Sequence, residues 1–456
     1  MKKVFELEST FKELIEWMQN NPDEVIKERQ RSTEQLIKKR CVFGDTPFQT
    51  TLVPLFLKKE SLDLIEKTSE LFDSVIDKVV GLYFSHEHIR DYFPYHEVPQ
   101  ELVHAHPGYE KATILNRLDM LFDGKTLKYI EFNTDNPGGK GWVDMYEEVF
   151  SQQSFYRDII ADYSIREERK ITKGLFNAAM NCFNEFAEEG EKPRCGFVTF
   201  REITMKQDDE IVRDFFIENG VEANIVDPRD LEFRDKRLYS NGIKFNLLIR
   251  SLKAHLYLRF PREMKDFKKS ILHKGACMVN SFRALLGSEK SILSFLSNHF
   301  NHHYFTEEEV ICIKAHIPWT RKLDETVTLS KEGEEISLKS YILKHKDELT
   351  LKPSWGAGGY NVMLGKSTGK SEWADCVEDN LGSSDWTVQE YIEVPEMEIP
   401  VIKNNKIVLE KKYFNLSPYV FGGKYVGTLG RVSEKDVINV SAGGGVMPVF
   451  PLKYDS

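Results

Sequence analysis

Carboxylate and amide side chains gather around one predicted turn of the chain. Asp119 precedes the turn residues Asp123-Gly124-Lys125, and Glu131 and Asn133 follow them. A β-hairpin on this turn would bring Asp119 close to Glu131 and Asn133, which share a strand face because side chains alternate. Their oxygens are hard ligands of the kind Mg²⁺ prefers. We therefore expect these three residues to bind Mg²⁺, although a polar hairpin face with surface ion pairs would use the same residue types.

Two arginines could hold anionic groups. Arg117 lies two residues before Asp119, so it should share that strand face. Arg431 ends an apolar, strand-like run, and Gly443-Gly444-Gly445 follows it. A guanidinium group can bind phosphate or carboxylate with two parallel hydrogen bonds, and it stabilises charge that develops during phosphoryl transfer. We expect both to be catalytic; a surface arginine beside a turn remains the alternative for Arg431.

A lysine and a glycine-rich loop form a second candidate site. Lys352 ends an apolar run, and a β-like segment resumes at residues 361–364. The loop between them contains Ser354, Gly356, Gly358 and Gly359. Glycines allow backbone N–H groups to approach phosphate oxygens, and a lysine adds positive charge. The lysine precedes the glycines, so this is not a GxxxxGK[ST] loop. The pattern predicts a phosphate-binding loop, with a tight hairpin as the alternative.

About thirty residues later, a buried strand becomes polar at its end. The strand starts at Trp386 and ends with Gln389, Glu390, Tyr391 and Ile392. The backbone at such a strand end could read the edge of an adenine base, although an ordinary strand end has the same pattern. Together with the glycine-rich loop, it predicts ATP held between two antiparallel sheets.

Distinct stretches of secondary structure must position these residues. Residues 1–100 have the apolar periodicity of amphipathic helices, and helical pattern returns at 143–187. Apolar runs near 195–200, 223–228 and 245–250, with a helix-like 208–219, predict a parallel β-α-β unit. The remainder, from about residue 340, is rich in strand signals and glycine.

Composition narrows the functional class. The 456 residues carry 62 Lys and Arg against 72 Asp and Glu, a net charge of −10, so nucleic acid is not an expected partner. The 6 cysteines form no metal-binding spacing, and no segment has the length and apolarity of a membrane span. We expect a cytoplasmic enzyme with no membrane association.

In this order, the residues resemble the circularly permuted ATP-grasp family, which includes the synthetase domain of glutathionylspermidine synthase. The family's Arg-x-Asp and Glu-x-Asn elements match Arg117, Asp119, Glu131 and Asn133. Its lysine before a glycine-rich loop matches Lys352, its hinge matches residues 389–392, and its late Gly-x-x-x-Arg matches Gly427 to Arg431. The resemblance also makes Lys290 a second phosphate-binding lysine. In permuted members the metal-binding carboxylates precede the phosphate loop, as they do here.

The resemblance implies an α+β fold with four parts. These are an N-terminal helical region (1–100), a metal-binding part of the permuted ATP-grasp core (101–190), a Rossmann-like α/β pre-ATP-grasp lobe for the substrate (191–275) and a nucleotide-binding lobe (276–456). The first part is helical in pattern, so the amidase domain of glutathionylspermidine synthase is not expected.

The implied reaction is the ATP-dependent ligation of a carboxylate to an amine or thiol. It would pass through an acyl phosphate and release ADP and phosphate, with ATP and Mg²⁺ bound by the residues named above. The substrates would be small molecules or peptides, or an acyl group on a carrier protein. An ATP-dependent phosphotransferase acting on a hydroxyl and a non-catalytic nucleotide-binding protein are the alternatives. The substrate pair and the oligomeric state are not specified by the sequence.

Overall fold

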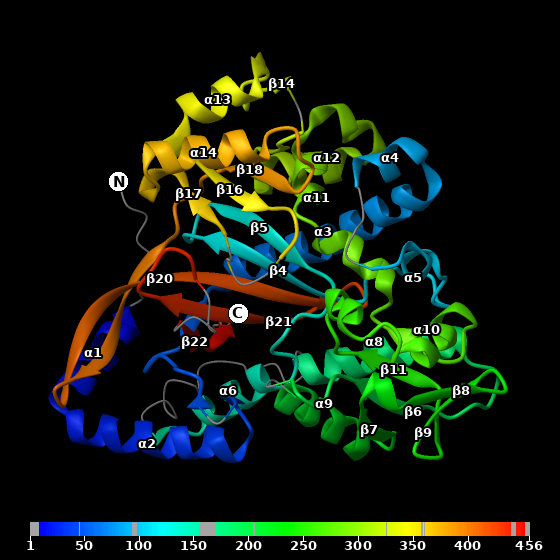
Figure 1. The fold of residues 1–456 in the computed structure, drawn as a ribbon. Helices are drawn as coiled ribbons and strands as arrows, with labels where there is room; N and C mark the ends of the chain where they lie inside the picture. The colour runs from blue at the N-terminus through cyan, green and yellow to red at the C-terminus, as the bar shows by residue number, and fades with distance from the viewer. Residues whose placement is uncertain are drawn as a thin grey trace.

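The computed structural model describes residues 9–44, 46–93, 98–154, 170–203, 206–324, 326–356, 359, 361–438 and 444–451. These residues form a mixed α/β structure in which a central sheet lies between two smaller lobes (Figure 1). One lobe is built on a parallel sheet, and the other on a short antiparallel sheet covered by α13 (Leu338–Lys344) and α14 (Lys370–Asn380).

The central sheet joins strands from distant parts of the sequence. It contains six antiparallel strands in the order β22-β21-β20-β4-β5, and β19 pairs with β20 beside this path. The strands are β4 (Leu115–Phe122), β5 (Leu127–Asn133), β19 (Glu396–Lys403), β20 (Lys406–Phe421), β21 (Lys424–Ser433) and β22 (Gly445–Met447). The predicted hairpin is therefore confirmed as β4–β5, and it pairs through β4 with β20.

The register of the hairpin decides which side chains share a face. Asp119 lies opposite Glu131, and Arg117 lies opposite Asn133. Met120 pairs with Tyr129, so Ile130 is an extra residue, a β-bulge. Simple alternation along the strand would bury Ile130 on the same face as Phe132. The bulge instead places Ile130 on the cavity side, and Tyr129 is buried in its place.

A long helix covers the opposite face of the hairpin. On α3 (Lys59–Ser85), Phe72 packs against Tyr129 and Phe132, with ring centroids 4.8 and 5.9 Å apart. The hydroxyl of Tyr129 is satisfied there by Ser69 and Thr68. The other helices of the N-terminal region are α1 (Ser9–Asn20), α2 (Pro22–Lys38), α4 (Glu87–Tyr92) and α5 (Gln100–His104). This region also has three short strands, β1 (Val42–Phe43), β2 (Thr46–Pro47) and β3 (Leu55–Leu57).

The predicted β-α-β unit is present as a four-stranded parallel sheet. Its order is β12-β11-β6-β7, and its strands are β6 (Arg194–Val198), β7 (Glu222–Val226), β11 (Leu247–Arg250) and β12 (Cys277–Val279). It packs with α8 (Ile171–Phe186), α9 (Lys206–Glu218) and α10 (Lys265–Leu272), while α6 (Trp142–Ser151) links the central sheet to this lobe. A small side sheet consists of β8 (Leu231–Arg234), β9 (Arg237–Ser240) and β10 (Ile243–Phe245).

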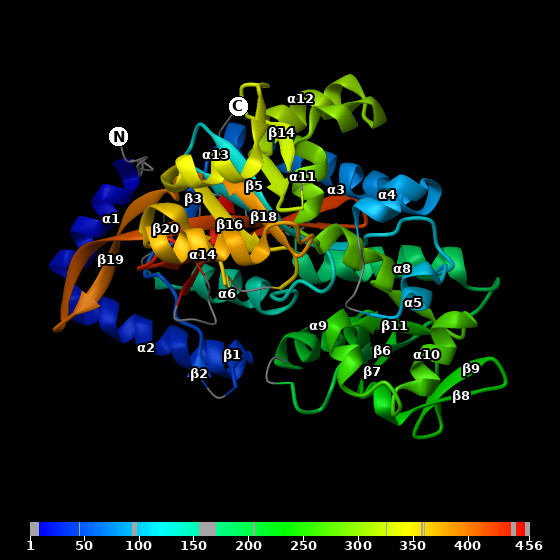
Figure 2. The ribbon, with the colours of Figure 1, turned by 45° about the horizontal axis from the view of Figure 1, so that its top comes forward.

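The second lobe carries the glycine-rich loop (Figure 2). Its sheet has the order β13-β18-β16-β17, with β13 (Thr320–Lys322), β16 (Leu349–Pro353), β17 (Met363–Leu364) and β18 (Trp386–Glu390). The β-like segment expected from residue 361 starts at Met363, because Asn361 has the left-handed φ of 56° that suits a turn. Helices α11 (Ser291–Ser297) and α12 (Glu307–His316) precede this sheet. Two further strand pairs lie outside the sheets described so far. In one, β14 (Val327–Leu329) pairs with β15 (Glu335–Ser337), and in the other, β23 (Val449–Pro451) pairs with β3.

Candidate active site

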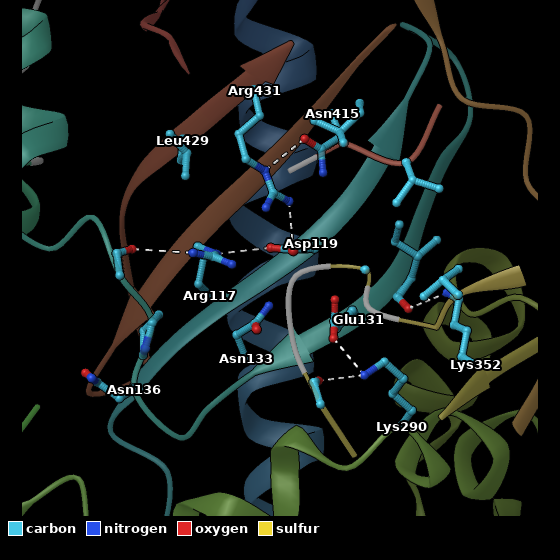
Figure 3. A pocket seen from close by; sticks show the side chains of 18 of the residues that line it. Arg117, Asp119, Glu131, Asn133, Asn136, Lys290, Lys352, Asn415, Leu429 and Arg431 are labelled. Atoms are coloured by element: carbon cyan, nitrogen blue, oxygen red, sulfur yellow. Dashed lines mark hydrogen bonds and ion pairs between the residues drawn. The ribbon is translucent and has the colours of Figure 1, made fainter. Parts of the chain in front are cut away.

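The predicted site residues meet in a cavity of about 610 Å³ between the central sheet and the two lobes. This volume is typical of small-molecule sites. The predicted residues that line it are Arg117, Asp119, Glu131, Asn133, Lys290, Lys352, Gly356, Gly359, Gln389, Glu390, Tyr391, Ile392 and Arg431. Figure 3 shows the side chains of β4, β5, β20 and β21 facing Lys290 and Lys352 across the cavity. Residues far apart in the sequence therefore form a single site.

Asp119 lies between two arginines. Its Oδ1 accepts a hydrogen bond from Nε of Arg117 at 3.1 Å, and its Oδ2 accepts one from Nη2 of Arg431 at 2.8 Å. Burial alone would raise the pKa of Asp119, but the two guanidinium groups hold it well below its usual value. The Asp119 carboxylate also raises the pKa of Arg117 against the opposing effect of burial. Arg117 and Asp119 are therefore both charged at neutral pH.

The neighbouring strand β20 orients Arg431. Asn415 lies opposite Arg431 in the β20–β21 register, and its Oδ1 accepts a hydrogen bond from Nε at 3.0 Å. Ser417, two residues further along, accepts one from Nη2 at 3.1 Å. These contacts direct the guanidinium group across β20 towards Asp119 on β4.

Lys290 connects Glu131, a predicted Mg²⁺ ligand, to the glycine-rich loop. Its Nζ lies 3.0 Å from Oε1 of Glu131 and donates to the carbonyl of Gly356 at 3.0 Å. Its side chain is only 8% exposed, so this contact lies inside the cavity wall. The lysine that the family resemblance assigned, directly before α11, is thus beside the predicted phosphate loop.

Lys352 lies on the other side of the same loop. Its Nζ donates to Oε1 of Gln389 at 2.6 Å and to the carbonyl of Ile130 at 3.3 Å. Burial, aided by the charge of Lys290, lowers the pKa of Lys352 to about 8, although Glu131 and Asp119 oppose the shift. Lys352 is therefore a cation that loses its proton more readily than an exposed lysine.

The donor set at the hairpin fits Mg²⁺. Asp119 and Glu131 are opposite each other, and Asn133 follows on the same strand face. Within the described ranges no three His, Cys, Asp or Glu side chains converge, so the protein offers two carboxylates and an amide rather than a complete cage. Mg²⁺ bound beside phosphates usually takes only one or two carboxylates and keeps several waters. In this structure the negative charge of Asp119 is balanced by ion pairs with Arg431 and Arg117, and that of Glu131 by an ion pair with Lys290.

Two of the predicted nucleotide-binding residues are placed differently from the rest. Ser354 is fully buried, donates to the carbonyl of Ser384 at 2.9 Å and does not line the cavity. It anchors the start of the loop. Gly358 lies outside the described residues. At the hinge, the backbone N–H groups of Glu390 and Tyr391 already donate to the carbonyls of Trp319 and Glu348.

Several lining residues were not predicted from the sequence. Asn415 lies in an ordinary strand pattern, and only its pairing with Arg431 reveals its role. Asn136 lies three residues after Asn133, so its place just beyond the hairpin was a usable signal. Thr199, Ser251 and Lys253 each come just after a parallel strand and also line the cavity.

Comparisons with known proteins reveal a similarity of fold. No family model matches the chain, and no curated protein sequence is significantly similar to it. Among solved structures, the chain is similar to a glutathione synthetase-like effector from Globodera pallida in its apo form, with a TM-score of 0.65, 10% identity and coverage of 94% of this chain and 98% of that one. A protein described as a gamma-glutamylcysteine synthetase from Methylobacillus flagellatus KT matches with a TM-score of 0.44, 12% identity and coverage of 83% and 87%.

The first of these matches shows that the chain has the mixed α/β fold of the glutathione synthetase-like effector over almost its whole length. In the part of the chain that the structure describes, no helix is both long enough and apolar enough to cross a membrane.

Proposed function

We propose that this chain is an ATP-dependent ligase that joins a carboxylic acid to an amine or thiol through an acyl phosphate. One observation carries the proposal: four cationic side chains line the same cavity as two opposed carboxylates and a glycine-rich loop. The cations are Arg117, Arg431, Lys290 and Lys352, and the carboxylates are Asp119 and Glu131. A triphosphate with its metal ion requires this combination of charges.

Each residue has a distinct role in this proposal. Lys290 and Lys352 neutralise phosphate oxygens, and the loop from Gly356 to Gly359 approaches them with its backbone. Asp119, Glu131 and Asn133 would hold Mg²⁺, which would withdraw negative charge from the phosphate groups. The adenine base lies against residues 389–392. Because the N–H groups of Glu390 and Tyr391 already donate to carbonyls within the protein, the base is recognised by the backbone carbonyls of this segment and by contact with Ile392.

The chemistry has two balanced steps. A carboxylate oxygen of the acid bonds to the γ-phosphorus of ATP, and the bond to the bridging oxygen breaks, which releases ADP. The nitrogen or sulfur of the second substrate then bonds to the acyl carbon, phosphate leaves, and the nucleophile loses a proton. Arg117 and Arg431 orient the acid and stabilise the charge on the transferring group.

The fold supports this reaction class by analogy. The similar effector from Globodera pallida is named for its likeness to glutathione synthetase, an enzyme name that implies ligation. In the proposal, residues 101–190 and 276–456 form a circularly permuted ATP-grasp core around the sheet that β4, β5, β20 and β21 share. Residues 191–275 form the substrate lobe, and residues 1–100 support the sheet through α3.

Trapping with hydroxylamine tests the proposal. The protein is incubated with ATP, Mg²⁺, hydroxylamine and a panel of acids, and ADP and hydroxamate are measured together. A ligase yields both in equal amounts, and ¹⁸O from a labelled carboxylate appears in the released phosphate. A phosphorylated alcohol without hydroxamate would identify a phosphotransferase. ATP binding without ADP release across acid, alcohol, amine and thiol panels would identify a non-catalytic protein.

A further inference from the structure

The end of the cavity far from Lys352 is formed by the parallel sheet. In the order β12-β11-β6-β7, the chain leaves β6 towards β7 on one side and leaves β11 towards β12 on the other. The strand order therefore reverses between β6 and β11, and open parallel sheets bind ligands beyond their carboxyl ends at such a point. Thr199 directly follows β6, Ser251 directly follows β11, and both line the cavity.

Asn136 lies between the parallel-sheet end of the cavity and the β4–β5 hairpin. Figure 3 shows Asn136 on the opposite side of the cavity from Lys352, with Arg117 and Asp119 between them. The side-chain amide of Asn136 donates to the carbonyl of Ser251 and accepts from Nζ of Lys140 at 2.8 Å. A ligand that contacts Arg117 and Arg431 at one end can therefore extend within the same cavity towards the parallel sheet.

The two acidic residues at this end are already neutralised. Asp208 accepts four hydrogen bonds of 2.8 to 3.1 Å from the backbone N–H groups of residues 139–142. Oδ1 of Asp209 accepts from Oγ of Ser251 at 2.6 Å and lies 3.2 Å from the buried ammonium group of Lys140. Neither carboxylate is therefore available to pair with the ammonium group of a cationic substrate.

The groups that lack partners at this end are hydrogen-bond donors. Lys253 lines the cavity, and its ammonium group has no ion pair or hydrogen bond with any residue that the structure describes. Among the described residues, Oγ1 of Thr199, a residue 1% exposed, and Nε1 of Trp142 are buried without a hydrogen-bond partner. Buried polar groups without partners are rare in proteins, and they are satisfied when a ligand binds. A positive charge and unmatched hydrogen-bond donors that line the same cavity favour an anionic ligand.

We propose that this end, the distal subsite formed by Thr199, Trp142 and Lys253, binds a second, non-reacting carboxylate of the acid substrate. The inference rests on the proposed ligase function and narrows it: the acid is a dicarboxylate whose reacting group lies against Arg117 and Arg431 on the cavity side. An uncharged amide in place of the second carboxylate loses the charged interaction with Lys253, which weakens binding about tenfold or more.

The test compares acids that differ in a single charge. L-glutamate is paired with L-glutamine, L-aspartate with L-asparagine, and succinate with succinamate. Each is added without ATP to the wild-type protein, and thermal unfolding and calorimetry measure binding. At least one dicarboxylate should raise the Tm and bind about tenfold or more tightly than its monoamide.

Variants identify the groups responsible. Lys253→Met should abolish the preference for the dicarboxylate, and Thr199→Val should reduce it. Lys265→Met, which changes an exposed lysine on α10 of the same lobe, is the matched control and should retain the preference. ATP binding is measured in every variant, and it should not change.

The outcomes separate this inference from the proposed function. Equal binding of the paired acids, no binding of any dicarboxylate, or an unaltered preference in Lys253→Met would overturn the distal subsite. Hydroxamate formed from monocarboxylates alone would also overturn it, while leaving the ligase function intact. A dicarboxylate that binds through Lys253 but gives neither ADP nor hydroxamate would support the distal subsite and overturn the ligase function.

Discussion

Nη2 of Arg431 donates to Oδ2 of Asp119 at 2.8 Å, although 312 residues separate the two in the sequence. Arg117 binds the other oxygen of the same carboxylate, so Asp119 fixes two guanidinium groups on one side of the cavity. Their positions are set before a substrate enters. Groups fixed in this way stabilise a transition state without the cost of reorganisation.

Replacing Arg431 should therefore affect turnover more than nucleotide binding. We expect Arg431→Ala to lower kcat by about 10² to 10³, because a preorganised donor to the transferring group is lost. The Kd for ATP should change little, since Lys290 and Lys352 remain. ADP release at saturating ATP and calorimetric titration of ATP measure the two effects. Arg194→Ala, at an exposed arginine paired with Glu222, is the control. A kcat near that of the wild type would remove Arg431 from the mechanism.

The affinity for ATP should depend on pH through Lys352. Burial lowers the pKa of Lys352 to about 8 from the ordinary 10.5. Phosphate groups favour the charged ammonium form, so the Kd for ATP should rise as the pH rises through about 8. Arg remains protonated throughout this range. Lys352→Arg should therefore flatten the profile, provided that it still binds ATP. Titrations between about pH 6.5 and 9.5 with the wild type and this variant give the comparison. A wild-type Kd that does not change above pH 8 would contradict the role.

The requirement for Mg²⁺ should depend on Glu131. Glu131→Gln keeps the shape of the side chain and removes its charge, and it also frees Lys290 from its ion pair at 3.0 Å. We expect the Mg²⁺ concentration for half-maximal ADP release to rise by about tenfold or more, since changes even beyond the direct ligands cost about 10- to 100-fold in metal affinity. Glu222→Gln, at an exposed glutamate of the parallel sheet, serves as the control. An unchanged Mg²⁺ dependence in Glu131→Gln would show that Glu131 is not a ligand.

Glu289 should reduce the stability of the protein as the pH rises. Its carboxyl group is fully buried, and burial raises its pKa from 4.5 to about 8, although the nearby hydroxyl of Ser291 opposes the shift. The folded protein holds this proton more tightly than the unfolded chain does. The free energy of unfolding should therefore fall as the pH rises from about 4.5 to about 8.

Glu289→Gln removes this titration without a large change in volume. The Tm of the variant should exceed that of the wild type by an amount that grows through the same pH range and then becomes constant. Thermal unfolding of both proteins, followed by circular dichroism, measures the difference. A difference that does not vary with pH would mean that Glu289 is not protonated in the folded state at neutral pH.

Much of the site could be predicted from local sequence patterns. The turn at residues 123–125 and the alternation around it predicted the hairpin, and the register places Asp119 opposite Glu131 as expected. The bulge at Ile130 was missed because it depends on how β4 and β5 pair, and neither strand contains a glycine that would mark it. The same bulge places the carbonyl of Ile130 within 3.3 Å of Nζ of Lys352.

Long-range pairing explains the remaining differences. Nothing local in β20 indicates that Asn415 orients Arg431, because the contact exists only once β20 and β21 align. Thr199 was placed inside the predicted strand near residues 195–200, and Lys253 was not singled out from the sequence. Their position at the cavity follows from the placing of β11 beside β6, an order that the sequence of apolar runs does not determine.

The pairing of β4 with β20 also constrains how the protein is made. The parallel sheet draws all four strands from residues 194–279, so it can assemble while later residues are still being synthesised. The hairpin that carries Asp119 and Glu131 must instead wait for residues 406–433 to emerge, and loops of that length close slowly. During this delay the strand edge of β4 is unpaired, and unpaired edges promote aggregation. Because β4 and β20 lie far apart in the sequence, nascent chains are therefore prone to aggregate through the edge of β4 until β20 has been translated.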